Sequence, residues 1–95
     1  MKPNPADPNP ADMEFADSST RLLSPAEVMS KGPTTLRVAR NEIYARKGRK
    51  FNDPWLRDWF SRYAWYRPLY DTVQLNPTEQ ANVDLLAKAE ARYGG

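Results

Sequence analysis

The sequence contains neither cysteine nor histidine. The chain therefore forms no disulfide, thiolate nucleophile or zinc–thiolate cluster, and it has no imidazole to act as a general base or metal ligand. It has no apolar run of about 18 residues that would span a bilayer. Its first thirty residues also lack the basic-then-apolar pattern of a secretory signal peptide. No carboxylate has a matching acid, base or metal-ligand partner at a spacing that would indicate a catalytic site. We therefore predict that the protein is not an enzyme and has no catalytic residue, metal site or cofactor.

Charge is distributed unevenly along the 95 residues, a length that suits one small domain with a modest core. The whole chain carries 14 Lys and Arg against 12 Asp and Glu, a net charge of +2. Residues 1–20 carry −3 and residues 71–95 carry −2, whereas residues 34–50 carry +5. The basic character is therefore concentrated in one segment.

A tandem pentapeptide, Pro-Asn-Pro-Ala-Asp, occupies residues 3–7 and 8–12. It offers no apolar side chain larger than Ala, and its prolines lack backbone donors. We therefore expect residues 1–20 to form an extended, disordered linker and residues 21–95 to form the folded domain. The linker is either a stiff spacer or a terminus without a role.

Cap, proline and glutamate patterns mark the starts of helices. Ser24-Pro25-Ala26-Glu27 predicts a short helix ending near Gly32, and Asn76-Pro77-Thr78-Glu79 predicts a last helix to about Arg92. Asp53-Pro54 begins a third helix expected to end before Pro68.

The second expected helix runs from about residue 34 to Gly48, with Leu36, Ala39 and Ile43 on one apolar face. No stretch alternates with a period of two strongly enough to predict a strand, although Thr72-Val73-Gln74-Leu75 could be extended for a few residues. The predicted fold is a small all-α bundle of about four helices.

The basic segment ends in Tyr44-Ala45-Arg46-Lys47-Gly48, and the run from Leu36 to Phe51 resembles the YARHG domain of bacteria. The resemblance continues through the pair Trp65-Tyr66 and the last helix start, covering about residues 22 to 92. Lys47 stands where the family motif has histidine. The resemblance implies an extracytoplasmic (periplasmic or secreted) module that occurs beside peptidase and kinase domains, without an assigned molecular function.

The motif has two interpretations. In the structural one, a satisfied polar network fixes how the second and third helices cross; its members are Arg40, Asn41, Glu42, Tyr44 and Gly48. In the functional one, an exposed cationic and aromatic surface binds an anionic or peptide-like ligand; its members are Arg46, Lys47, Arg49, Lys50, Trp65 and Tyr66. Lys47 has too high an unperturbed pKa to carry protons near neutral pH, but it serves well as a hydrogen-bond donor.

Eight of the eleven aromatic residues lie between Phe51 and Tyr70. They either build the core of a domain with few aliphatic residues or provide a partner or carbohydrate platform, with Arg57, Arg62 and Arg67 among them.

We interpret the chain as a non-catalytic binding module of the bacterial cell envelope or exterior. Its expected partner is a protein or a cell-wall glycan or peptide. The alternative is a small nucleic-acid-binding protein that uses the basic helix 34–50. The small net charge and the acidic ends of the chain weigh against nucleic acid.

Overall fold

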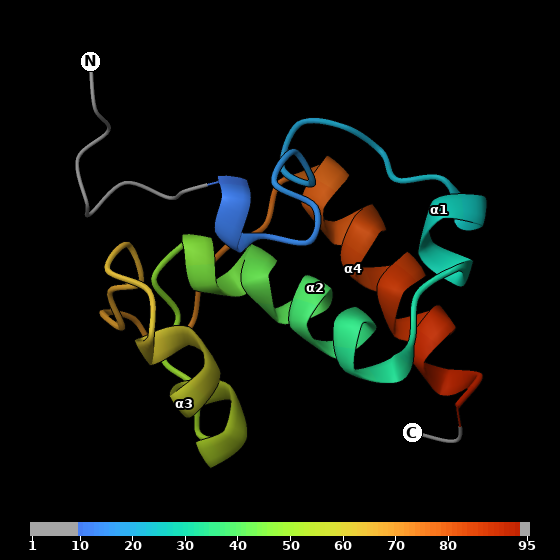
Figure 1. The fold of residues 1–95 in the computed structure, drawn as a ribbon. Helices are drawn as coiled ribbons and strands as arrows, with labels where there is room; N and C mark the ends of the chain where they lie inside the picture. The colour runs from blue at the N-terminus through green and yellow to red at the C-terminus, as the bar shows by residue number, and fades with distance from the viewer. Residues whose placement is uncertain (1–9, 94–95) are drawn as a thin grey trace.

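The computed structural model describes residues 10–93 and is all-α, as predicted. It contains a short 3₁₀ turn, η1 (Pro10–Asp12), and four α-helices, shown in Figure 1. The helices are α1 (Pro25–Met29), α2 (Pro33–Arg46), α3 (Pro54–Ser61) and α4 (Pro77–Ala91). Within the described residues, strand-like pairing is limited to one isolated bridge between Arg49 and Tyr70.

The predicted caps begin α1, α3 and α4. Ser24 and Asn76 each form a complete capping box with the glutamate three residues later, and Asp53 accepts the backbone N–H of Trp55. Each of these helices has proline in its first turn, where the missing N–H costs nothing. Local side-chain chemistry therefore determines where these helices start.

Helix α3 ends at Ser61, before Pro68 as predicted. The chain turns after Phe60, and Trp65 packs edge-on against the Phe60 ring with only 6% of its surface exposed. The Tyr66 hydroxyl then donates to the carbonyl of Arg49 at 2.7 Å. These contacts require the chain to reverse, so ring burial prevails over continuation of the helix.

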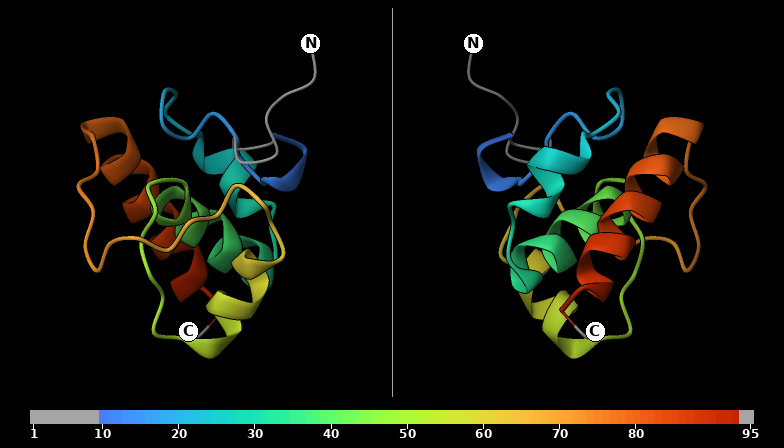
Figure 2. Two further views of the ribbon diagram at one scale, coloured as in Figure 1. Left: turned by 90° about the vertical axis from the view of Figure 1, so that its left-hand side faces the viewer. Right: turned by 90° about the vertical axis from the view of Figure 1, so that its right-hand side faces the viewer.

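Helix α2 lies at the centre, between two apolar clusters (Figures 1 and 2). One cluster joins α2 to α1 and α4, and the other joins it to α3 and the following loop. The first contains Phe15, Leu23, Val28, Leu36, Ala39, Ile43, Val83, Leu86 and Ala89. The second contains Val38, Ala45, Phe51, Leu56, Phe60 and Trp65.

The boundary expected at residue 20 is corrected by the structure. Residues 1–9 of the expected linker lie outside the described residues, but residues 10–20 pack against the helices, with Phe15 and Ser18 buried. Residues 13–23, here called the N-terminal segment, cross α2 and the start of α4 (Figure 1). Phe15 and Leu23 of this segment join the first apolar cluster, and buried polar groups of the helices hold its backbone.

Candidate binding surface

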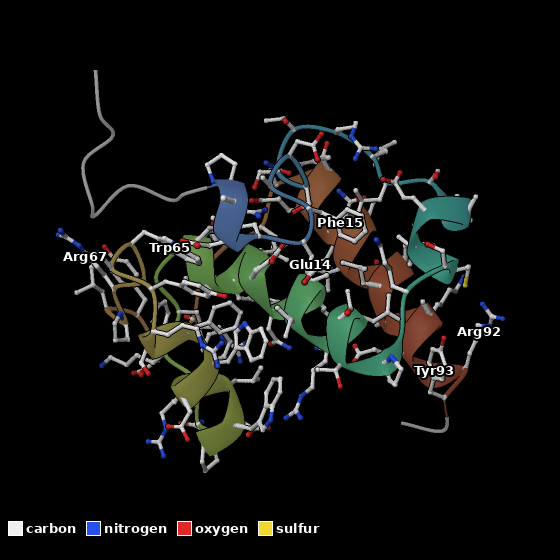
Figure 3. All side chains as sticks on the ribbon, in the orientation of Figure 1. Glu14, Phe15, Trp65, Arg67, Arg92 and Tyr93 are labelled. Carbon is white, nitrogen blue, oxygen red and sulfur yellow. The ribbon has the colours of Figure 1, made fainter. Side chains whose placement is uncertain are left out.

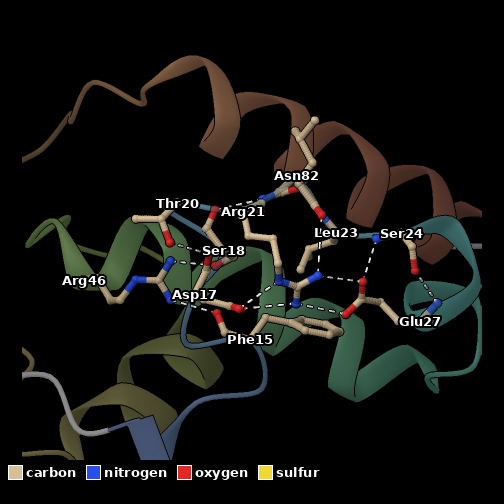
Figure 4. Close-up of polar contacts among 11 residues, drawn as sticks. Phe15, Asp17, Ser18, Thr20, Arg21, Leu23, Ser24, Glu27, Arg46 and Asn82 are labelled. Atoms are coloured by element: carbon tan, nitrogen blue, oxygen red, sulfur yellow. Dashed lines mark hydrogen bonds and ion pairs between the residues drawn. The ribbon is translucent and has the colours of Figure 1, made fainter.

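Two polar side chains of α2 hold the N-terminal segment. Glu42 accepts the backbone N–H groups of Glu14 and Phe15 at 3.0 and 2.8 Å. One turn later, the Arg46 guanidinium donates to the Ser18 hydroxyl at 2.6 Å and to the Phe15 carbonyl at 3.3 Å (Figure 4). Because Glu42 and Arg46 follow each other by four residues, both face the same side of the helix and the same stretch of chain.

Helix α4 contributes a third anchor, Asn82. Its side-chain carbonyl accepts the N–H of Leu23 at 2.9 Å, and its amide donates to the carbonyls of Ser18 and Arg21 at 2.8 Å each (Figure 4). A buried asparagine is tolerated when its donors and acceptors are satisfied, as they are here. The Asn82 side chain thereby pairs with backbone groups of the N-terminal segment that a neighbouring strand or helix would otherwise pair with.

A fourth anchor, Glu79, connects three parts of the fold. It caps α4 by accepting the N–H of Asn76 at 2.8 Å, it accepts the Ser19 hydroxyl at 2.7 Å, and its carboxylate lies 3.1 Å from the Lys47 ammonium. Burial acts to raise the pKa of Glu79, but these three donors outweigh it and the pKa is lowered. Lys47 therefore neutralises a buried carboxylate at the position where the family motif has histidine.

Glu42 has a different electrostatic environment. Burial raises its pKa to about 7, although two backbone N–H groups and Arg46, 3.9 Å away, favour the charged form. Burial likewise lowers the pKa of Arg46. Both side chains bind the N-terminal segment, so the pair anchors the chain.

Two of the residues predicted to bind a ligand are buried. The Arg46 side chain is only 10% exposed, and its donors are engaged by the N-terminal segment. Trp65 points inward, and its indole N–H donates to the carboxylate of Asp12 at 3.2 Å (Figure 3). Most of the Arg46 and Trp65 side chains is thus engaged within the fold, and their remaining surface lines a hollow of about 200 Å³ together with Lys47. A role of these residues in binding stays a prediction.

The predicted polar network is divided among separate contacts. Arg40 forms an ion pair with Glu90 of α4. Asn41 donates to the carbonyl of Arg37 within α2, and the Tyr44 ring lies under the guanidinium of Arg49 at 4.8 Å. Together with Glu42, these residues contact α4, α2 itself and the N-terminal segment. Tyr44 also packs against the second apolar cluster, which joins α2 to α3.

Gly48 turns the chain after α2. Its φ of +86° suits glycine, and a Cβ at this position would lie 3.0 Å from the carbonyl of Arg67. The Gly48 carbonyl accepts the N–H groups of Leu69 and Tyr70 at 2.9 Å each, and the N–H of Lys50 donates to the Tyr70 carbonyl at 2.7 Å. The turn therefore brings the end of the basic segment against the loop that follows α3.

This arrangement brings Lys50 and Tyr66, both predicted to bind a ligand, to one surface hollow of about 410 Å³. We call it the basic–aromatic hollow. It is lined by Lys50, Phe51, Asn52, Arg57, Ser61, Tyr66 and Pro68, a set without a carboxylate. The rings of Phe51 and Tyr66 stack with centroids 5.9 Å apart, so part of the lining is rigid and apolar.

The two cations of the basic–aromatic hollow are exposed and weakly engaged. Lys50 lies 3.9 Å from Asp71, which is itself 91% exposed, and Arg57 has no ion pair among the described residues. Arg57 is absent from the residues predicted to bind, although the sequence places it among the clustered aromatics. The position of Arg57 among aromatic residues is the sequence signal that indicates a binding role for it.

The tryptophans of α3 form a stacked pair, Trp55 on Trp59, with ring centroids 5.3 Å apart. The guanidinium of Arg37 lies 4.7 Å from the Trp55 ring, and that of Arg62 lies 4.2 Å from the Trp59 ring. Trp55 is 38% exposed. Because guanidinium groups cover these rings, the pair is poorly suited to stacking against a sugar.

The cations of helix 34–50 do not form one basic stripe. Most of them are engaged within the domain: Arg37 with Asp53, Arg40 with Glu90, Lys47 with Glu79, and Arg46 with the N-terminal segment. Nucleic-acid affinity depends on cations that are free to neutralise phosphates. The pairing therefore weighs against the nucleic-acid alternative.

Each helix within residues 10–93 is too short or too polar to span a bilayer. The acidic side chains of the same residues form no group of three that could hold a metal ion.

The fold and the surface define a small all-α domain built around one central helix, with a short N-terminal segment clamped across it. The family model of the YARHG domain matches residues 11–91, and the chain belongs to this family. The match includes the N-terminal segment. No curated protein and no solved structure matches the chain significantly.

Proposed function

We propose that this YARHG domain is a non-catalytic binding module of the bacterial cell envelope or exterior, and that it binds an acidic segment of a partner protein. The observation that carries the proposal is the basic–aromatic hollow, where exposed Lys50 and Arg57 flank an apolar, aromatic lining without a carboxylate. The extracytoplasmic location rests on the family alone.

An acidic protein segment suits this hollow for two reasons. Its carboxylates complement the two cations, and the planar guanidinium of Arg57 can hold a carboxylate through two parallel bonds. Its apolar side chains complement the half-buried Tyr66 ring, because aromatic surface flanked by arginine is typical of binding hot spots. A polyanionic cell-wall polymer would gain more from a long row of cations than from two.

The test is an affinity pull-down from a bacterial envelope fraction with this chain as bait, eluted in a salt gradient. We expect a stoichiometric protein that is lost from the double variant Lys50→Ala/Arg57→Ala. The control is Lys88→Ala/Arg92→Ala, which removes the same charge from the end of α4 and should retain the partner. Equal retention by both variants would overturn the proposal, and nucleic acid that elutes steeply with salt would favour the alternative.

A further inference from the structure

Residues 71–75 leave their backbone unpaired. They run between Tyr70, which is paired with residues 48–50, and the cap of α4 at Asn76. Among the described residues, no backbone N–H or C=O of residues 71–75 has a hydrogen-bond partner. Backbone polar groups bind strongly to any available donor or acceptor. This stretch therefore exposes a row of them to water or to a partner.

The side chains of the same stretch alternate as in a strand. Val73 and Leu75 are half-buried, and Leu75 packs against the first apolar cluster, while Thr72 and Gln74 are exposed. This period of two is typical of an extended chain with one face against the protein. Thr72 and Val73 are β-branched, which also favours extended backbone.

The stretch follows a short backbone pairing and a bend at Asp71. Arg49 and Tyr70 form a parallel bridge, and Lys50 donates its N–H to the Tyr70 carbonyl. Phe51 then packs into the second apolar cluster, and among the described residues no further backbone hydrogen bond joins this side to residues 71–75. Residues 69–75 contain neither proline nor lysine, two residue types that commonly protect exposed edges from pairing.

The surroundings indicate what would pair there. Leu69 and Tyr70 are 60% and 55% exposed, and a hollow of about 390 Å³ lies between Lys47, Tyr70 and residues 72–74. The adjoining turns carry an excess of positive charge over Asp71, from Arg49, Lys50 and Arg67, whereas Lys47 is paired with Glu79. Arg67 lies on the exposed loop after α3, near the buried Trp65 (Figure 3). Apolar and acidic side chains in alternation complement such a surface.

We propose that residues 71–75 receive an extended, acidic segment of a partner protein as an added β-strand. The proposal rests on the proposed function, and it adds that the partner is a polypeptide bound through its backbone. Lys50 connects the two sites, because it lines the basic–aromatic hollow and pairs with Tyr70 at the start of the edge. Main-chain bonds would provide affinity, and the alternating side chains would provide specificity.

The probe is an acetylated and amidated octapeptide that alternates glutamate with valine, titrated into the ¹⁵N-labelled chain. We expect slower hydrogen exchange at the amides of residues 71–75 and chemical-shift changes at Lys50. The matched control is the same peptide with N-methylated valines, which has the same charge but lacks half of the backbone donors. We expect it to bind at least about tenfold more weakly, the equivalent of one or two lost hydrogen bonds.

The outcomes separate this proposal from the previous one. One outcome is that both peptides bind equally and that Lys50→Ala/Arg57→Ala lowers the affinity for both. Strand addition is then wrong, and the basic–aromatic hollow is the binding site. If N-methylation abolishes binding and the double variant does not change it, the edge binds and the hollow does not. Absence of binding by the unmodified peptide at about 1 mM, where even a weak site would be half filled, overturns strand addition.

Discussion

The carboxylate of Glu42, in the middle of α2, accepts the backbone N–H of Phe15 at 2.8 Å. The bond connects residues 27 positions apart, and both partners are buried. It coincides with insertion of the Phe15 ring into the first apolar cluster. One polar bond and one apolar contact therefore fix the same point of the N-terminal segment.

Replacing Glu42 with alanine should lower the free energy of unfolding by about 1–3 kcal/mol, because the N–H of Phe15 then remains buried without an acceptor. Urea denaturation followed by circular dichroism measures the change. Asp58→Ala is the control, since Asp58 is exposed on α3 and its loss should cost less than about 0.5 kcal/mol. An unchanged midpoint for Glu42→Ala would contradict the anchoring role.

Stability should fall as the pH rises from 5 to 8. Glu42 has a pKa of about 7 in the folded chain against an ordinary value of 4.5, so the folded state binds the proton more tightly. Its contribution is fully present below pH 4.5 and is lost as the pH rises through 7, by up to about 3 kcal/mol. Unfolding free energies across this range should show the slope, and Glu42→Gln should remove it. Carboxylates with lowered pKa values, such as Glu79, act only at lower pH.

Arg46→Lys keeps the positive charge but removes the planar fork that reaches Ser18 and the Phe15 carbonyl. We expect a loss of about 1–2 kcal/mol and faster hydrogen exchange in the N-terminal segment. Lys50→Arg, at an exposed position, is the matched control and should leave both unchanged. If instead Arg46→Lys weakened partner binding without changing exchange, Arg46 would act at the surface.

Gly48→Ala should destabilise the domain by about 1–3 kcal/mol, because it forces a positive φ on a residue with a Cβ and places that atom 3.0 Å from the Arg67 carbonyl. Gly32→Ala is a useful comparison, since no atom lies within 4 Å of its Cβ position and its φ is −79°. Melting temperatures of both variants measure the difference. A larger loss for Gly32→Ala would refute the assignment of strain to Gly48.

The sequence predicts the features of this fold that depend on neighbouring residues. Ser24, Asp53 and Asn76 identify helix starts because a cap and its partner lie within three residues. The anchors of the N-terminal segment are not predictable in this way. The partners of Glu42 and Asn82 lie 27 to 64 positions away, beyond the reach of any local sequence pattern.

The same distinction separates the candidate site residues. Lys50 and Tyr66 line the same surface hollow, and their role in binding stays a prediction. In the sequence, Arg46 is indistinguishable from the other cations of the basic segment. Only the tertiary fold shows that its guanidinium donates to the hydroxyls of Ser18 and Ser19. Trp65 is likewise indistinguishable in sequence from an exposed aromatic until its neighbours are known.

Glu79 has a consequence for where this domain can be divided. One carboxylate closes the start of α4, receives Ser19 from the N-terminal segment and neutralises Lys47 at the end of α2. A fragment cut at residue 21, where composition suggests a boundary, would strip partners from Glu79, Glu42 and Arg46 at once. The three parts should unfold as one cooperative unit, so a recombinant domain needs the chain from residue 10 onward.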